Sequence, residues 1–421
     1  MKRRKKKKLK LKKKFKVLLI IIFIVIIMFA IKNNKNTNNI SSNKTNDIEQ
    51  LLNKKSYLEN YDNSSNVDID SSIKDVIIKY LDLYYKSMIN LKSEDVTSLF
   101  LDSNSDEAYL TQKALDLLIN HHKLQMNDMK LSKAKYDVDI IKVNKLDNEV
   151  EVVFLENGVI RFNYLNVDSK LIDVKNTIKL EKVNNKYKIK SLRVIQGNYV
   201  MFTNELDVVN KSSVDNLYNK YMENIKNEVS KNKKLFEEAK NKKYVTNIKC
   251  DGSYNRSDAV KYSYQYTTKR NSEYIAYDEF GGNCQNLVSQ SIHAGGIPMD
   301  ISGDYEWKHY GSEINEKNEK IGRSTSWTGT QNFYEYIVNN KGTGICADKD
   351  INLFYASEGD VGHVGYIDYS HAVLISKVIK DRDGNVIDLL VNSNTASLEN
   401  YPFLGYVYTN KRIIKILGYN K

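Results

Sequence analysis

The hydrophobic positions of the chain change their spacing several times, and each change predicts a new region. Residues 17–31 form an unbroken apolar run, whereas residues 33–71 have few apolar positions and are rich in Asn, Ser, Lys and Asp. The first segment predicts a helix inserted in a membrane, and the second predicts a disordered tether that buries too little apolar surface to fold. From Ser72 onward the apolar spacing is typical of folded helices and strands.

Residues 1–32 are predicted to be a cytoplasmic basic tail followed by a transmembrane signal anchor. The apolar run lies between a signal-peptide core and a full span of about 20 residues. Residues 2–16 contain 12 Lys or Arg and no acid, so the positive-inside rule places the later regions outside the cell. No small-residue cleavage site follows, which favours an uncleaved anchor; a cleaved signal peptide is the alternative.

The positive net charge of the chain indicates membrane topology, because it is confined to the N-terminus. The formal net charge is +12, and the 12 cations of residues 2–16 account for all of it, so the remainder has no net charge. We therefore expect a membrane partner at the N-terminus and no nucleic-acid partner. No phosphate-binding glycine loop of the GxxxxGKS type is present, and we expect no cofactor.

Residues 72–205 have the pattern of an α+β domain. Helical spacing around Val76, Tyr80 and Tyr84 and over residues 108–120 predicts two helices, and alternating positions predict strands at 135–143, 149–154, 159–165, 173–182 and 187–194. Helices followed by strands are an α+β order, and this order resembles the NTF2-like fold. His121 and His122 adjoin at a helix end; adjacent helical residues point in different directions, which favours a solvated pair over a metal site.

Residues 206–245 are charged and amphipathic and predict a helical linker to a C-terminal domain at 246–421. That domain begins with a predicted helix, in which Tyr254 is expected to pack on the helix that follows Cys284 and to support the site. It ends in predicted strands at 361–369, 371–378, 386–393 and 405–417. Of the three cysteines, Cys250 and Cys346 could form a bridge outside the cell or be two unrelated buried thiols.

Cys284 is the candidate nucleophile. Gly281-Gly282 predicts a turn, Asn283 a helix N-cap, and Leu287, Val288 and Ile292 the apolar stripe of a short helix that Gly295-Gly296 ends. The free N–H groups and the positive dipole end at a helix start favour a thiolate. Since free Cys is often a small buried hydrophobe, the alternative is a structural role.

His371 is the candidate base, because it directly precedes a strongly apolar strand. A helix-start Cys, a strand-start His and a later strand ending in Asn392-Ser393-Asn394 follow the chain order of papain-like cysteine enzymes. His363 is the second choice as base, ahead of His309 and His293. No His, Cys, Asp and Glu grouping has zinc-ligand spacing, so we expect no metal.

The motif around Cys284 resembles the putative amidase domain family of Gram-positive bacteria, which is similar to the papain-like NlpC/P60 and CHAP hydrolases. The resemblance covers about residues 252–415 and rests on these residues: Tyr254, Arg256, Ala259, Tyr262, Gly281-Gly282, Cys284, Asn286, Val288-Ser289-Gln290, Ala294-Gly295-Gly296, Trp327, Gly359-Asp360 and His371-Ala372-Val373. The family usually has Asp directly before the Cys and a late His-Thr pair, where this chain has Asn283 and Asn394-Thr395. The implied fold of the region is papain-like.

We therefore expect an exported, membrane-anchored cysteine amidase or peptidase that cleaves amide bonds of cell-wall peptidoglycan through a Cys284-His371-Asn394 triad, with Asn392 as the rival to Asn394. Backbone N–H groups at Asn283 and Cys284 would hold the oxyanion. The substrate is implied by the resemblance and the outward topology. The alternative is an inactive amidase-like protein that binds or assembles envelope components, with the departures at Asn283 and Asn394 marking lost catalysis.

Overall fold

The computed structural model describes residues 58–61, 69–278, 282–301, 305–309, 322–395 and 397–421. The predicted anchor lies outside this part of the chain, as does almost all of the predicted tether. No helix within these described ranges is long and apolar enough to cross a membrane. Residues 56–276 and 283–421 form one compact unit, which is described below.

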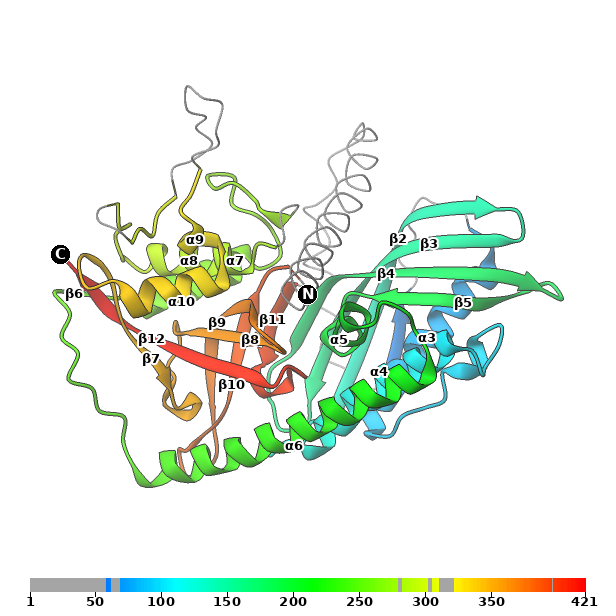
Figure 1. Cartoon of the computed structure of the whole chain (residues 1–421), viewed down its shortest axis with the longest axis horizontal. Coiled ribbons are helices and arrows are strands. Elements are labelled where there is room, and N and C mark those ends of the chain that lie inside the picture. Colours follow the sequence, from blue (N-terminus) through cyan, green and yellow to red (C-terminus); the bar gives the residue numbers. More distant parts are fainter. Residues whose placement is uncertain (1–57, 62–68, 279–281, 302–304, 310–321, 396) are drawn as a thin grey trace, which may run out of the picture. The chain divides into compact units, whose positions relative to one another are not determined.

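The first half of this unit contains helices α3, α4 and α5 and long antiparallel strands (Figure 1). Its elements are β1 (Leu58–Tyr61), α3 (Ser71–Asn90), the 3-10 turn η1 (Thr97–Leu99), α4 (Asp106–Leu124), β2 (Leu131–Leu146), β3 (Glu149–Phe162), β4 (Ser169–Val183), β5 (Lys186–Val194) and α5 (Gly197–Glu205). The Asp70 side chain caps α3 by accepting from the Ser72 N–H at 3.0 Å. The predicted strands at 149–154 and 159–165 are one strand, β3, whose register with β4 shifts between Glu156 and Gly158.

The second half begins with a long helix and ends in strands. Its elements are α6 (Lys211–Asn241), β6 (Gly252–Ser253), α7 (Arg256–Tyr266), α8 (Cys284–Ala294), α9 (Thr325–Thr328), α10 (Thr330–Asn339), β7 (Gly344–Ile351), η3 (Leu353–Tyr355), β8 (Val361–Gly365), β9 (Tyr369–Lys380), β10 (Val386–Ser393), β11 (Ser397–Pro402), η4 (Phe403–Gly405) and β12 (Asn410–Asn420). The predicted linker is mostly α6, which buries Val214, Tyr221 and Ile225 and packs on α4.

One sheet joins both halves, in the order β1-β2-β3-β4-β11-β10-β9-β8-β12-β6, with β5 on β4 and β7 on β12. The joint is antiparallel pairing of β11 with β4, in which Leu398 lies opposite Leu171. Lys170 and Glu399 form an ion pair at 2.9 Å beside it. The predicted α+β class, with its run of antiparallel strands, is confirmed.

The two faces of β9 are buried in two different cores, as expected for a strand with alternating side chains. Ala372 and Leu374 belong to a cluster built around α8. Val373 and Ile375 belong to a larger cluster that contains the buried residues of α3, α4 and β2–β5. Consequently the first half of the unit covers one face of the C-terminal strands.

Cys250 and Cys346 form a disulfide with their Cα atoms 5.8 Å apart. This settles the question that the sequence left open. The bridge ties the start of the C-terminal region to β7 across 96 residues of chain. Cys284 is the free cysteine and is buried.

His121 and His122 correct the expectation of a solvated pair, because both side chains are buried, at 0% and 1% exposure. The His122 ring packs edge-on against Phe162 with ring centroids 5.9 Å apart, and the Gln125 amide contacts His121 Nε2 at 2.9 Å. Burial lowers the pKa of His122 to about 4 and lowers the pKa of His121 well below its usual value.

We predict that His122 makes the fold sensitive to acid. Between about pH 6.5 and 4, His122 binds a proton in the unfolded state but stays neutral in the folded state. The free energy of unfolding therefore falls as the pH falls. From pH 7 to pH 5 this loss amounts to about 2 kcal/mol. His122→Leu should reduce the loss by about that amount in urea unfolding measured at both pH values.

Glu156 is the matched comparison, since its shift has the opposite sign. Burial raises the pKa of this carboxyl to about 7, so the folded state binds the extra proton and its contribution to stability increases on acidification. Glu156→Gln should therefore make the loss between pH 7 and pH 5 larger. An unchanged pH dependence in both variants would contradict the prediction.

Candidate active site

The site is built at the N-terminus of α8, where Cys284 is the first helical residue. Gly282, just before it, has a φ of 128°, a conformation that favours glycine; Gly281 lies outside the described residues. The predicted stripe of Leu287, Val288 and Ile292 is buried, which fixes the helix and leaves its first N–H groups around the Cys284 side chain.

The structure brings Cys284 and His371 together. His371 is the third residue of β9, and its imidazole lies close enough to the Cys284 sulfur to lower the pKa of the thiol, as do the backbone groups of Ala372 and Gln285. Burial raises the pKa of the Cys284 thiol, but the nearby His371 charge and these backbone groups outweigh burial, so the pKa lies below its usual value. This sulfur is therefore poised to ionise next to a base.

Asn283 holds the helix start without capping it by its side chain. Its backbone N–H donates to Thr395 Oγ1 at 2.6 Å, and its Nδ2 donates to Asn394 Oδ1 at 3.3 Å. Its Oδ1 accepts from Asn286 Nδ2 at 2.7 Å. The residue before the nucleophile is thus tied to the segment that follows β10 and to the first turn of α8.

The contacts of Asn394 and Asn392 do not support an orienting role for either one. Asn394 Nδ2 donates to the Tyr266 carbonyl at 3.2 Å, and its Oδ1 accepts from Asn283. Asn392 donates to Ser263 Oγ at 3.0 Å and accepts from the Asn400 N–H at 3.0 Å. Since both ends of each amide are engaged away from His371, the third member of the predicted triad stays a prediction.

Tyr254 lies at the opposite end of α8. A Cβ built on Gly295, which ends that helix, would come within 2.3 Å of the Tyr254 ring, so the tyrosine is about 16 Å along the axis from Cys284. Its hydroxyl donates to the Gly359 carbonyl at 2.8 Å. Tyr254 therefore stabilises the far end of α8 and the segment around Gly359, and it does not contact the predicted oxyanion site.

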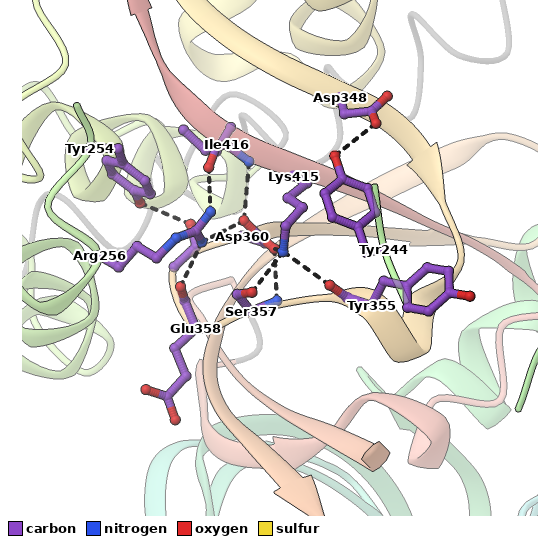
Figure 2. A network of polar contacts seen from close by, with 11 residues as sticks. Tyr244, Tyr254, Arg256, Asp348, Tyr355, Ser357, Glu358, Asp360, Lys415 and Ile416 are labelled. Carbon is purple, nitrogen blue, oxygen red and sulfur yellow. Dashed lines mark hydrogen bonds and ion pairs between the residues drawn. The ribbon is translucent and has the colours of Figure 1, made fainter. Parts of the chain in front are cut away.

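Figure 2 shows the polar network of which Tyr254 is a member. At its centre the buried carboxylate of Asp360 accepts from Arg256 Nη1 at 2.6 Å and from Lys415 Nζ at 3.3 Å. Arg256 also donates to the carbonyls of Glu358 and Ile416. The family-like Arg256 and Asp360 thus act as a structural clamp between α7, β8 and β12, because a buried charge requires partners.

His363 contacts Gln285, the neighbour of Cys284, and both of its ring nitrogens are engaged. Its Nδ1 accepts from Arg412 Nε at 3.1 Å and its Nε2 bonds to Gln285 Oε1 at 3.1 Å. Burial and the Arg412 charge lower its pKa well below the usual value. His363 therefore fits a positioning role toward Gln285, the neighbour of Cys284.

The remaining histidines are engaged elsewhere. His293 Nδ1 contacts the Ile297 carbonyl at 2.8 Å, and His309 Nε2 accepts from the Ile275 N–H at 3.3 Å. No group of three or more His, Cys, Asp or Glu within the described ranges could hold a metal ion.

Several site residues were missed from the sequence. Thr395 binds the Asn283 N–H, and the Tyr406 ring lies 6.0 Å from that of His371, between centroids. Gln285 and Arg412 each contact one ring nitrogen of His363. Gln285, directly after the nucleophile, was within reach of sequence reasoning; Tyr406 and Arg412 have no local signal.

The two departures from the family pattern, Asn283 and Asn394, contact each other. We therefore predict that they are coupled. Asn283→Asp alone replaces the donor facing Asn394 Oδ1 with a second oxygen, which should cost about 1–3 kcal/mol of unfolding free energy. Asn283→Asp with Asn394→His would supply an N–H opposite the carboxylate and should recover at least about 1 kcal/mol, measured by a urea double-mutant cycle. Additive effects would show that the two positions are independent.

Comparison with known proteins places the C-terminal region in a family. Residues 253–417 match the family model described as "putative amidase domain", which confirms the resemblance seen in the sequence. The uncharacterized protein YhbB of Bacillus subtilis (strain 168) is 32% identical over 148 residues, which are 34% of this chain and 42% of that protein. The chain thus spans less than half the length of that curated relative.

A solved structure was also matched. It is the crystal structure of a putative scytalone dehydratase from Novosphingobium aromaticivorans DSM 12444, with 14% identity and a TM-score of 0.21, covering 30% of this chain and 85% of the other. A likeness of this size carries no conclusion about fold or activity.

Proposed function

Because residues 253–417 form a domain of the putative amidase family, we propose that the protein is a cysteine amidase or peptidase in which Cys284 is the nucleophile and His371 the general acid and base. The observation that carries this proposal is the closeness of the His371 imidazole to the Cys284 sulfur at the start of α8. A thiolate beside an imidazole is the arrangement that thiol acyl transfer requires.

In the proposed reaction His371 takes the Cys284 proton, and the thiolate attacks the carbonyl carbon of the amide. The Cys284 N–H group at the helix start stabilises the oxyanion, whereas Asn283, the other predicted donor, has its N–H bound to Thr395 Oγ1. Collapse of this intermediate breaks the C–N bond, His371 returns its proton to the leaving amine, and a thioester remains. Water then attacks the thioester, gives a proton to His371, and releases a carboxylic acid while Cys284 regains its hydrogen.

We place the enzyme outside the cell, on a membrane anchor at residues 1–32 and a tether at 33–71, with cell-wall peptidoglycan or its peptides as substrate. The Cys250–Cys346 disulfide supports this location, because disulfides persist in oxidising compartments. Protease added to intact protoplasts should degrade residues 246–421. Their full protection would refute the location and, with it, the wall substrate.

We also propose finer assignments for the fold: an NTF2-like arrangement for residues 72–205 and a papain-like arrangement for the amidase domain. The supporting features are the two helices followed by strands in the first region and the helix-start Cys facing a strand-start His in the second.

A digest of purified cell wall tests the activity. The full-length protein should release new amine and carboxyl ends that mass spectrometry detects, and Cys284→Ala should release none. The second candidate function is an inactive, envelope-binding protein, which the departures at Asn283 and Asn394 favour. Iodoacetamide separates the two, because a thiol with a lowered pKa reacts well below about pH 8. An unreactive Cys284 together with an intact wall would establish the binding function.

A further inference from the structure

A pocket of about 250 Å³ adjoins the candidate active site. Its walls combine Tyr84 and Met88 of α3, Val200 of α5 and Tyr401 of β11 with His371 itself. We propose that this pocket is a substrate subsite that takes one uncharged aromatic or branched aliphatic group on the amine side of the scissile amide. The proposal rests on the amidase function proposed above and specifies which amides that enzyme would prefer as substrates.

The chemistry of the walls defines the class of occupant. None of the 21 lining residues is Asp, Glu, Lys or Arg, so a charged group would lose its hydration without gaining an oppositely charged partner other than His371. Most of the lining is aliphatic or aromatic, with few polar side chains among the walls. Small-molecule sites have this character: apolar walls with a few placed polar groups.

The size of the pocket fits one such group. A cavity of roughly 150 Å³ can hold a benzene molecule, so the volume of about 250 Å³ admits a benzyl or isobutyl group with part of its chain. Ile195 also lines the pocket and is 54% exposed, which leaves an apolar contact near the solvent for an entering ligand.

The position of His371 assigns the side of the amide. His371 lines the pocket, whereas Cys284 does not. Since His371 gives its proton to the leaving nitrogen, the substituent on that nitrogen is the one closest to the imidazole and to the pocket. The first half of the chain thereby contributes to the specificity of a reaction performed by residues of the second half.

Binding without turnover provides the first test. The probe is N-benzylacetamide, titrated into full-length Cys284→Ala and followed by ligand-observed NMR. Ile195→Trp, which fills the mouth of the pocket from an exposed position, should weaken binding at least tenfold. Val208→Trp, at a residue that is 72% exposed and does not line the pocket, is the matched control and should bind as the parent does. Val200→Phe provides a second pocket-filling variant should Ile195→Trp fail to fold.

Turnover provides the second test and separates the two proposals. With the active protein, kcat/KM for N-benzylacetamide should exceed that for N-methylacetamide by at least tenfold, and Ile195→Trp should abolish that preference. The isomer N-methyl-2-phenylacetamide, with its apolar group on the acyl side, should be hydrolysed no faster than N-methylacetamide. If the pocket variants weaken binding but the active protein hydrolyses none of these amides, the amidase is refuted and the apolar subsite is retained. If the pocket variants leave kcat/KM unchanged, or if the acyl-side isomer is hydrolysed faster, the subsite assignment is wrong.

Discussion

Cys284→Ala and His371→Ala are each expected to lower the amide hydrolysis rate by at least about 10³-fold, because each removes one half of a thiol and imidazole pair that acts as a unit. The double variant should be little worse than either single one, since groups that act together lose their effect together. Release of new amine ends from purified cell wall, measured at one protein concentration for all three variants, provides the comparison.

His363→Ala is the informative control for this experiment. His363 binds Gln285 and Arg412 with its two ring nitrogens, so its loss should lower stability and disturb the helix start, with a smaller loss of rate. His363→Gln, which keeps a polar side chain between the two partners, should recover part of both. Activity that survives His371→Ala and disappears with His363→Ala would move the base to His363.

The parts of the site that are local in sequence could be predicted. The Cys at a helix start and the apolar stripe of α8 lie within residues 284–294, where spacing alone indicates structure. His371 was found because it precedes a buried strand. Strands β2, β4 and β5 also followed from their alternating positions.

The rest depends on contacts between distant residues. The disulfide joins cysteines 96 residues apart, and no spacing rule gives their distance in space. The Asn283 contact with Asn394 spans 111 residues. Strand β11 was missed because the short stretch from Ser397 to Pro402 includes Glu399, Asn400 and a terminal Pro, and its assignment depends on pairing with β4.

A fragment of residues 243–421 is expected to be insoluble or unfolded, although the sequence places a domain boundary at 206–245. In that fragment β11 loses its partner β4. Val373, Ile375 and Leu389, which are fully buried in a cluster that residues of both halves form, lose part of their cover. Fully exposing three such side chains would cost about 5–9 kcal/mol, which is comparable to the whole stability of a domain.

Asp388 adds a polar cost to the same truncation. Its side chain is fully buried and accepts from the Tyr164 hydroxyl at 2.7 Å, and Tyr164 is absent from the fragment. In the intact chain Tyr164→Phe isolates this contact and should lower the free energy of unfolding by about 1–3 kcal/mol while the fold persists. Gel filtration and circular dichroism of the fragment, with Tyr164→Phe as the mild reference, measure both effects. A fragment that is monomeric, unfolds cooperatively and cleaves cell wall like the full chain would show that the β4 to β11 seam is dispensable and that residues 206–245 separate two independent domains.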